Sequence, residues 1–245
     1  MQELIRANSL EDAKITAYHI GFVLGPCINA SGRLDTAARS LALLNAKTKE
    51  EAARLAGDLT ALNQSRKALT EKGKEEAIRI IETTELKNDR VLVVYLPDCH
   101  ESLAGIIAGR IREKYHRPAF VLTGGETSAK GSGRSIESYS MYEELVKCAD
   151  LMIQFGGHPM AAGLSIEEKN IEEFRRRLNV NCTLTDEELR PKIVIDVPMP
   201  VSYITKELVE QISLLEPLEK GIQNRSLHRK ISECLITVLS GKIKM

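Results

Sequence analysis

An uninterrupted helical pattern from Thr48 to about Glu82 is the feature that most limits how this chain of 245 residues can fold. Its apolar residues recur at steps of three and four, which places them on one face of an α-helix. They are Ala52, Leu55, Leu59, Leu62, Leu69, Ala77, Ile78 and Ile81. A helix of this length is suited to connecting two domains.

The composition is ordinary for a soluble protein, with 43% hydrophobic and 28% charged residues. The chain is long enough for one or two domains with a sizeable core. No run approaches the roughly 18 apolar residues of a membrane span, and no signal peptide is visible, so no membrane association is expected. The five cysteines form no C-x-x-C pair, so we expect neither a zinc site nor a disulfide framework, and a reducing cytoplasm fits. They are Cys27, Cys99, Cys148, Cys182 and Cys234.

The segment before the long helix is predicted to form a helix and then a short apolar stretch, Ile20–Leu24. A turn at Gly25-Pro26 and a loop over Asn29–Arg33 follow. Asp35 is the expected N-cap of a further helix that ends near Asn45.

After the long helix, apolar runs and helical patterns alternate, which predicts an α/β domain with a mixed sheet and flanking helices. Strands are expected at Arg90–Leu96, Pro118–Leu122, Ala129–Ile136 and Gly163–Ile166, and helices at Ser102–Tyr115, Tyr142–Cys148, Leu151–Phe155 and Asn170–Leu178. A strand at Lys192–Asp196 and a helix at Lys206–Leu214 open another unit.

Two segments rich in small residues are candidates for binding an anion. The first, Phe155–Gly163, reads FGGHPMAAG, and its paired glycines let backbone amides approach an anion closely, while the histidine can donate a hydrogen bond. The second, Gly131–Ser135, reads GSGRS and carries a guanidinium suited to bidentate phosphate contact. Either segment alone is weak evidence for an anion-binding site.

Four motifs in a consistent order resemble those of the RecJ family of DHH phosphoesterases. GPCINASGRL at Gly25–Leu34 is similar to the family pattern GP-x-INA-x-GRL, and CHESLAGIIAGRI at Cys99–Ile111 is similar to WH-x-GVIGIVASRL. The second departs at Cys99, Ser102 and Ala104. The two small-residue segments, Gly131–Ser135 and Phe155–Gly163, together resemble motifs of the DHH-associated domain. Leu214–Pro217 resembles the start of a motif in the family's third domain. The resemblance covers roughly residues 1–217.

The resemblance implies a domain order. Residues 1–35 would be the end of a catalytic DHH domain, 36–85 a helical connector and 86–182 the DHH-associated, substrate-binding domain. Residues 183–217 would begin a truncated β-rich, OB-like domain. The family's catalytic aspartates and DHH triplet would precede Met1, and this chain contains neither Asp-His-His nor Asp-x-Asp. We therefore expect a fragment with no catalytic residue and no metal ligand of its own.

The resemblance also implies an activity, namely hydrolysis of single-stranded DNA from the 5′ end in DNA repair and recombination. Mn²⁺ or Mg²⁺ would activate water in the parent protein, expected to be monomeric. The second candidate function is that of another DHH phosphoesterase, one that acts on oligonucleotides or cyclic dinucleotides. A third candidate, from a different functional class, is a non-catalytic remnant that binds nucleic acid. With 34 basic and 34 acidic residues the composition does not indicate DNA binding, although phosphates can be gripped in a local groove without a basic excess.

Nine residues are the expected substrate-binding positions under this resemblance. They are Asn29, Arg33, His100, Ser132, Arg134, Ser135, Gly156, Gly157 and His158. Each group has a structural alternative: a turn for the first two, a helix cap for His100, a strand with a surface arginine for the Ser-Gly-Arg segment, and a glycine-rich helix end for the last three. Cys27 stands where the family motif commonly has arginine. The basic runs Arg110–Arg117 and Arg175–Arg177 are expected to be solvated helix faces.

The resemblance stops after Pro217. Inserting one T into one possible set of codons for residues 218–228 restores the sequence FGKGNPKPVFA, which fits the family pattern FGxGNPxPxF. We therefore expect residues 218–245 to be an out-of-frame tail that packs poorly.

Overall fold

The computed structural model describes residues 1–192, 197–198, 200–214, 227–230 and 235–238. The backbone divides into two units, Met1–Arg190 and Pro191–Met245, and each is described by itself. The mixed α/β fold predicted from the sequence, with its long connecting helix, is confirmed in the first unit.

The first unit begins with short helices, of which α1, α3 and α4 pack on one long helix. They are α1 (Gln2–Ala7), α2 (Ala17–His19), the π-helical turn Ile20–Leu24, α3 (Gly25–Leu34) and α4 (Ala38–Asn45), followed by α5 (Lys49–Thr83). The predicted extent of α5 is confirmed, and the Thr48 side chain caps it by accepting from the Glu51 backbone N–H at 3.2 Å. Its first half contributes Leu55 and Leu59 to a core with α1 and α3, and its second half contributes Ala77 and Ile81 to the core under the sheet. The helix therefore connects two packed regions, as predicted.

The turn predicted at Gly25-Pro26 and the loop predicted over Asn29–Arg33 are wrong, because both lie within α3. Pro26 falls in the first helical turn, where a missing N–H removes no hydrogen bond. A Cβ at Gly25 would lie 2.8 Å from the Ile20 carbonyl oxygen, so glycine is what allows the π-helical turn to continue directly into α3. Asp35 is likewise not an N-cap: it ends α3, and α4 begins after Ala37.

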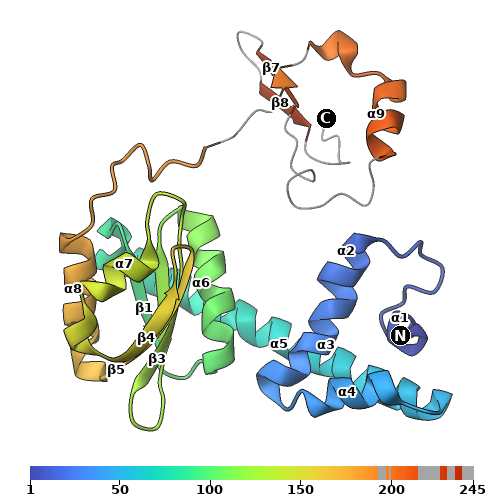
Figure 1. Cartoon of the computed structure of the whole chain (residues 1–245), viewed down its shortest axis with the longest axis horizontal. Helices are drawn as coiled ribbons and strands as arrows, with labels where there is room; N and C mark the ends of the chain where they lie inside the picture. Colours follow the sequence, from blue (N-terminus) through green and yellow to red (C-terminus); the bar gives the residue numbers. More distant parts are fainter. Residues whose placement is uncertain (193–196, 199, 215–226, 231–234, 239–245) are drawn as a thin grey trace. The chain divides into compact units, whose positions relative to one another are not determined.

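The first unit contains a five-stranded sheet in the order β1-β2-β3-β5-β4 (Figure 1). The strands are β1 (Leu92–Leu96), β2 (Ala119–Thr123), β3 (Ala129–Arg134), β4 (Met152–His158) and β5 (Ala161–Ile166). β1 and β2 are parallel and joined by α6 (Glu101–Tyr115), as parallel neighbours require, and the other pairs are antiparallel. Short 3₁₀ turns lie at Glu85–Asn88, Ala149–Leu151 and Glu168–Asn170.

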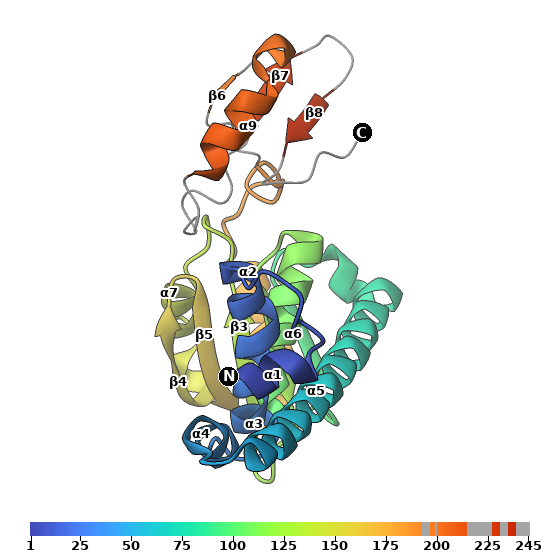
Figure 2. The same ribbon diagram turned by 90° about the vertical axis from the view of Figure 1, so that its right-hand side faces the viewer.

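The two faces of this sheet are covered differently. One face packs against α7 (Met141–Val146) and α8 (Ile171–Val180) around a core centred on Phe120 and Phe174. On the other face, α6 packs on β2 and β3. There, β4 and β5 present exposed residues such as Gln154, Gly156 and Gly163. Figure 2 shows β4 and β5 at the side of the sheet away from α5.

The sequence also mispredicted the start of β4. Leu151–Phe155 was expected to be helical, but only Leu151 belongs to a 3₁₀ turn, and the strand begins at Met152. Pairing with β5 decides the outcome, because tertiary context overrides local propensity in a segment this short. The glycine-rich segment Phe155–Gly163 forms a hairpin, with Gly156, Gly157 and His158 at the end of β4 and Ala161 at the start of β5.

The second unit contains α9 (Lys206–Ser213), which confirms the predicted helix, and Thr205 caps it by accepting from the Leu208 N–H. It also has a 3₁₀ turn at Val201–Tyr203 and a sheet of β6 (Val197–Pro198), β7 (Leu227–Lys230) and β8 (Leu235–Val238). The strand predicted at Lys192–Asp196 lies, apart from Lys192, outside the described residues. So does most of the tail expected to be out of frame.

Candidate nucleic-acid interface

The two small-residue segments, separate in the sequence, meet on the sheet. Both β3 and β4 pair with β5, so residues of the two motifs lie in common rows across the three strands. The rows are Ser132, Gly163 and Gly156, followed by Arg134, Ala161 and His158. Because residues in register share a face of a sheet, the predicted Ser, Arg and His all lie on one side of it. This is the face that β5 and β4 leave exposed.

The glycines of this region divide by the face on which a side chain would stand. A Cβ at Gly156 would meet nothing within 4 Å, and one at Gly163 would meet only the Gly131 carbonyl oxygen at 3.8 Å. By contrast, a Cβ at Gly133 would lie 2.5 Å from the sulfur of Met141. Gly133 is therefore required for packing the core, whereas Gly156 and Gly163 keep the exposed face flat and its backbone accessible.

Gly157 has a third role, in the backbone of the hairpin. Its φ of +157° lies in a region that residues with a Cβ rarely adopt, and a Cβ there would stand 2.5 Å from the Ala161 carbonyl oxygen. The close approach of β4 to β5 at the hairpin end thus requires glycine at this position.

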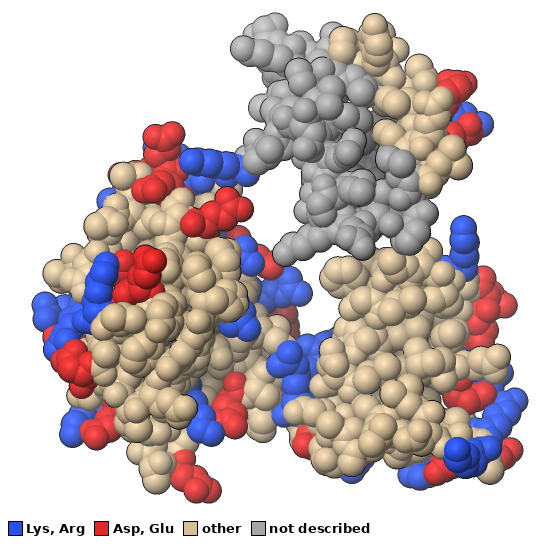
Figure 3. Space-filling model, in the orientation of Figure 1, with Lys and Arg blue, Asp and Glu red and all other residues tan. Residues whose placement is uncertain are grey.

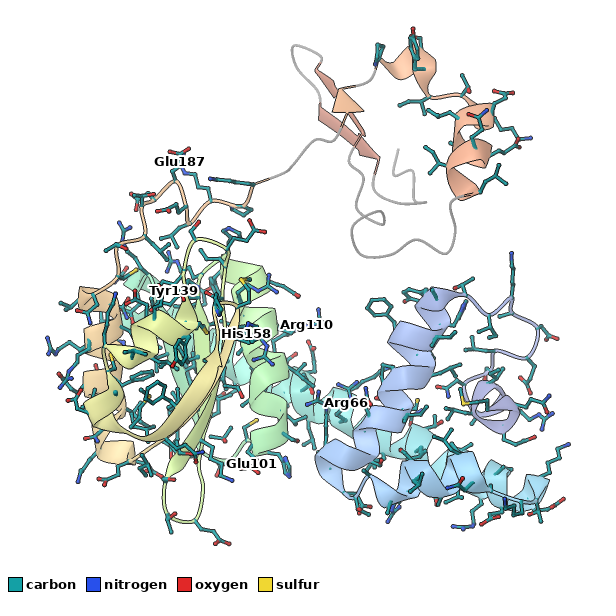
Figure 4. All side chains as sticks on the ribbon, in the orientation of Figure 1. Arg66, Glu101, Arg110, Tyr139, His158 and Glu187 are labelled. Carbon is teal, nitrogen blue, oxygen red and sulfur yellow. The ribbon has the colours of Figure 1, made fainter. Side chains whose placement is uncertain are left out.

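A groove of about 520 Å³ runs over this face and is walled by the first turn of α6. Ser132 and Gly156 line its floor, and Ser102 lines its α6 side. An ion pair of 2.6 Å between Lys130 and Glu101 joins β3 to α6. Arg134 and His158 do not line this groove but lie in a neighbouring row of the same face, and we name the groove together with that row the sheet groove. Figure 4 labels Glu101 at the start of α6 and His158 at the end of β4.

Arg134 lies against α6 in a slot that two glycines provide. A Cβ at Gly105 would lie 2.7 Å from Nη2 of Arg134, and one at Gly109 would lie 4.0 Å from its Cγ. Nη1 donates to the Gly133 carbonyl oxygen at 2.7 Å, and within the described part of the chain no carboxylate forms an ion pair with Arg134. Burial lowers the pKa of this guanidinium, and the charges of Arg33 and Arg112 lower it further. A bound anion would relieve that repulsion.

His158 is placed to donate a hydrogen bond from the same row. Its Nδ1 accepts from the Met160 backbone N–H at 3.3 Å, so the neutral ring carries its proton on Nε2. The side chain is exposed. An arginine without a carboxylate, a serine hydroxyl and an imidazole N–H thus share one face with a glycine floor, which is a donor set for phosphate.

Several known proteins are similar to this chain in sequence or in structure. Residues 88–182 match the DHHA1 domain family. The chain is 36% identical over 220 residues to the single-stranded-DNA-specific exonuclease RecJ of Salmonella typhimurium, and this match covers 86% of the chain and 38% of that protein. It is 32% identical over 240 residues to RecJ of Bacillus subtilis, which covers 96% of the chain and 30% of that protein.

A crystal structure of RecJ from Thermus thermophilus in complex with Mg²⁺ superimposes with a TM-score of 0.77 at 26% identity, covering 98% of this chain and 39% of that one. Residues 88–182 thus resemble the DHHA1 domain family, and the chain is similar to RecJ over most of its own length. It spans between 30% and 38% of the length of the two curated relatives named above.

The remaining predicted residues do not line the sheet groove. Ser135 is only 1% exposed, and its hydroxyl donates to the Tyr139 carbonyl oxygen inside the DHHA1 domain. His100 is the N-cap of α6, where its Nδ1 accepts from the Ser102 N–H at 3.3 Å. His100 thus caps a helix, which is the structural alternative given for it, and a substrate role for His100 or Ser135 stays a prediction.

Asn29 and Arg33 lie on α3 rather than in a loop, and they line a different groove. Arg33 is still connected to the DHHA1 domain, because its Nη1 donates to the Ser102 carbonyl oxygen at 2.8 Å. Cys27, at the position of the family's arginine, is fully buried in the core of the N-terminal helices, where the Asn63 side chain donates to its sulfur.

The basic run in α8 is paired with acidic neighbours, and Arg175 is largely buried rather than on a solvated face. Arg175 forms a bidentate pair with Asp89, with Nε to Oδ2 at 2.6 Å and Nη2 to Oδ1 at 3.2 Å. Arg176 pairs with Glu173, and Arg177 pairs with both Glu173 and Asp150. Each of these arginines thus has a carboxylate partner, in contrast to Arg134.

Sequence reasoning missed Gly105, Gly109 and Arg112 of α6. The signal was present as glycines four residues apart, a spacing that leaves one helix face without side chains. Arg112 was grouped with a solvated face, but its Nε is buried and has no hydrogen-bond partner among the described residues, and its charge acts on Arg134.

RecJ of Thermus thermophilus has been crystallised with Mg²⁺ and with Mn²⁺, which agrees with the metals expected for the parent enzyme. Within the described ranges of this chain, no three His, Cys, Asp or Glu side chains are grouped so that they could hold a metal ion, and we assign no metal ligand there. None of the helices described is both long and apolar enough to span a bilayer.

Proposed function

We propose that this chain supplies the substrate-binding part of a single-stranded-DNA-specific exonuclease that acts from the 5′ end in DNA repair and recombination. The observation that carries the proposal is the convergence of Ser132, Arg134 and His158 on one exposed face of the sheet, beside the open positions at Gly156 and Gly163. Homology to RecJ over most of the chain supports the substrate class. Single-stranded DNA is the proposed partner. We propose that the parent protein is a monomer located in the cytoplasm.

The sheet groove suits a phosphodiester for three reasons. Arg134 carries a charge that no carboxylate of the described residues neutralises. The Nε2–H of His158 and the hydroxyl of Ser132 add neutral donors in adjoining rows. The missing side chains at Gly156 and Gly163 let a phosphate approach the backbone itself. In the parent protein, divalent metal ions would supply the activated water, while the residues described here hold and orient the strand.

Binding measurements on the full chain test this proposal. Arg134→Ala should weaken binding of a 5′-phosphorylated single strand by about 1–3 kcal/mol, or about 5- to 150-fold, the range of a charge-assisted contact. His158→Ala should weaken it less, with the fold intact. Arg176→Ala removes an equal charge from α8, where the arginine is paired with Glu173, and serves as the control. Wild-type affinity in both Arg134→Ala and His158→Ala would refute the proposed role of the sheet groove.

A second measurement concerns catalysis by the chain alone. We expect no nucleotide release from a 5′-phosphorylated single strand in Mn²⁺, because residues that hold a strand cannot activate water without a metal centre. Metal-dependent nucleotide release by the pure chain, lost in Arg134→Ala, would overturn this expectation and place a catalytic centre within these residues.

A further inference from the structure

A row of polar side chains crosses the sheet groove at the end away from Arg134 and His158. Its members are in register across β3, β5 and β4, and they line the groove together with the first turn of α6. Gly156 and Gly163 lie in the row between the two ends. The members are Lys130, Ser165 and Gln154, which we name the polar row.

The face is long enough to present three environments in succession. Arg134 and Lys130 are separated by four residues along β3, as are His158 and Gln154 along β4, so the two outer rows lie about 13 Å apart. The glycine floor between them is flat, because a Cβ at Gly156 would meet nothing within 4 Å. Phosphate donors, a flat floor and a polar row thus follow one another in the order of the phosphate, sugar and base of a nucleotide.

The end of the groove at the polar row does not suit a second phosphate. Its one cation, Lys130, is paired with Glu101, with Nζ 2.6 Å from Oε2. Strands β4 and β5 contain no Lys, Arg, Asp or Glu, and Figure 3 shows the surface over them without these residues. A phosphate at this end would therefore face the Glu101 carboxylate without a free cation, whereas a neutral base would not be repelled.

Gln154 has the hydrogen-bonding groups that such a base requires. Its side chain is exposed and forms no hydrogen bond with any other residue that the structure describes. The amide presents an acceptor oxygen and an NH₂ donor side by side, which is the pair that matches N6 and N7 of adenine. The Glu101 carboxylate across the groove only accepts, so it also favours a base with an amino group over thymine, whose O4 is an acceptor.

We propose that the polar row recognises the 5′-terminal base of the bound strand through Gln154 and selects adenine over thymine at that position. The inference rests on the proposed function, because a terminal phosphate at Arg134 and His158 is what brings the first base to Gln154. It goes beyond that function, because holding a single strand by its phosphates requires no contact with the edge of a base. The consequence is an exonuclease whose binding depends on the sequence of the strand end.

The test measures the affinity of the full chain for 5′-phosphorylated thymidylate strands of one length that differ only in the terminal base. Two analogues examine the contact: a terminal purine lacks the N6 amino group of adenine, and a terminal 7-deazaadenine lacks the N7 acceptor. A further strand carries its single adenine in the interior. Gln154→Leu removes the amide, and the control Gln64→Leu makes the same change at an exposed position of α5 that does not line the groove. Thermal melting checks that each variant is folded.

The wild type should bind the strand with terminal adenine about 5- to 150-fold more tightly than the strand with terminal thymine, the range for one bidentate contact with a base. Either analogue, or moving the adenine to the interior, should remove most of this preference. Gln154→Leu should bind both strands with the affinity that the wild type has for terminal thymine, and Gln64→Leu should behave as the wild type. Equal affinity of the wild type for all four terminal bases, a preference for another base, or a preference that Gln154→Leu retains would overturn the inference.

Arg134→Ala distinguishes this inference from the proposed function, because it should weaken binding for every terminal base alike. If Arg134→Ala weakens binding and the wild type shows no preference among the terminal bases, the inference fails and the proposed function survives. Absence of binding to every strand refutes both.

Discussion

Replacing both exposed glycines of the sheet groove by alanine should separate binding from stability. Neither Gly156 nor Gly163 has a positive φ, and a Cβ at each would meet open space or a contact of 3.8 Å. A Gly→Ala change at a compatible position stabilises a protein by about 0.4–1 kcal/mol, because it restricts the unfolded chain. The double variant should therefore be at least about 0.4 kcal/mol more stable, and the two values are not summed because Gly156 and Gly163 pair directly across β4 and β5.

The same two methyl groups should harm binding. They would occupy the floor of the sheet groove, where we propose that a phosphate approaches the backbone, next to Ser132 in the same row. Losing that approach should weaken binding of a 5′-phosphorylated single strand by at least about tenfold, or about 1.4 kcal/mol. A gain in stability with a loss of affinity is an outcome that a purely structural role for these glycines does not give.

Gly133→Ala provides the opposite case on the neighbouring strand. Its Cβ would lie 2.5 Å from the Met141 sulfur and 2.6 Å from the Phe120 ring, so overpacking should lower the stability by about 1–3 kcal/mol. The variant that remains folded should bind normally, because this position faces the core.

Urea unfolding and fluorescence anisotropy on the same preparations give both quantities for each variant. The reasoning is refuted if the Gly156→Ala and Gly163→Ala double variant is destabilised, or if it binds the strand as tightly as the wild type. It is also refuted if Gly133→Ala is as stable as the wild type, because the assignment of faces would then be incorrect.

Two further outcomes follow from the structure. Asn179→Ala should cost about 1–3 kcal/mol in urea unfolding, because the amide accepts from the N–H groups of Arg90 and Val91 and donates to the Val91 carbonyl oxygen, and its loss leaves these groups unpaired; an unchanged midpoint would contradict this. The out-of-frame tail predicts early proteolysis after about residue 218 and one missing T in the codons after Pro217. The similarity to Bacillus subtilis RecJ covers 96% of the chain and so extends past Pro217, which makes resequencing of that junction decisive: an intact reading frame would refute the frameshift.

The parts of the fold that the sequence predicted correctly are those that local pattern determines. The long helix α5 was predicted to within a residue at each end, because its apolar stripe and its Thr48 cap are both visible in the sequence. β1, α6 and β2 followed from apolar runs and a helical period in the same way.

The errors occurred where one residue type serves several structures. Glycine, proline and asparagine suggested a turn and a loop at Gly25–Leu34, yet Pro26 is tolerated in the first turn of α3 and Gly25 accommodates the preceding π-helical turn. Leu151–Phe155 has too few residues for its period to decide, and its pairing with β5 is a long-range contact that no local pattern contains.

The candidate site shows the same division. The residue types of the sheet groove were visible in the sequence, but the register that puts Arg134 and His158 on either side of Ala161 was not. Nor could the sequence show that Ser135, next to Arg134, points into the domain, because one step along a strand reverses the face. The identity of each predicted residue was thus less informative than its position in the strand.

α6 borders two grooves: the sheet groove, and the groove between α3, α5 and α6 that Asn29 and Arg33 line, here called the helical groove. Successive residues of a helix differ in direction by about 100°, so the stripe of Gly105 and Gly109 lies beside the stripe of Ile106 and Arg110. The first stripe has no side chains and receives Arg134 from the sheet, while the second carries an apolar and a cationic side chain to the helical groove. A shift of the sequence by one residue would place bulk against Arg134 and remove a cation from the helical groove. The motif at Cys99–Ile111 therefore determines both grooves. A movement of α6 that changed one groove would also change the other.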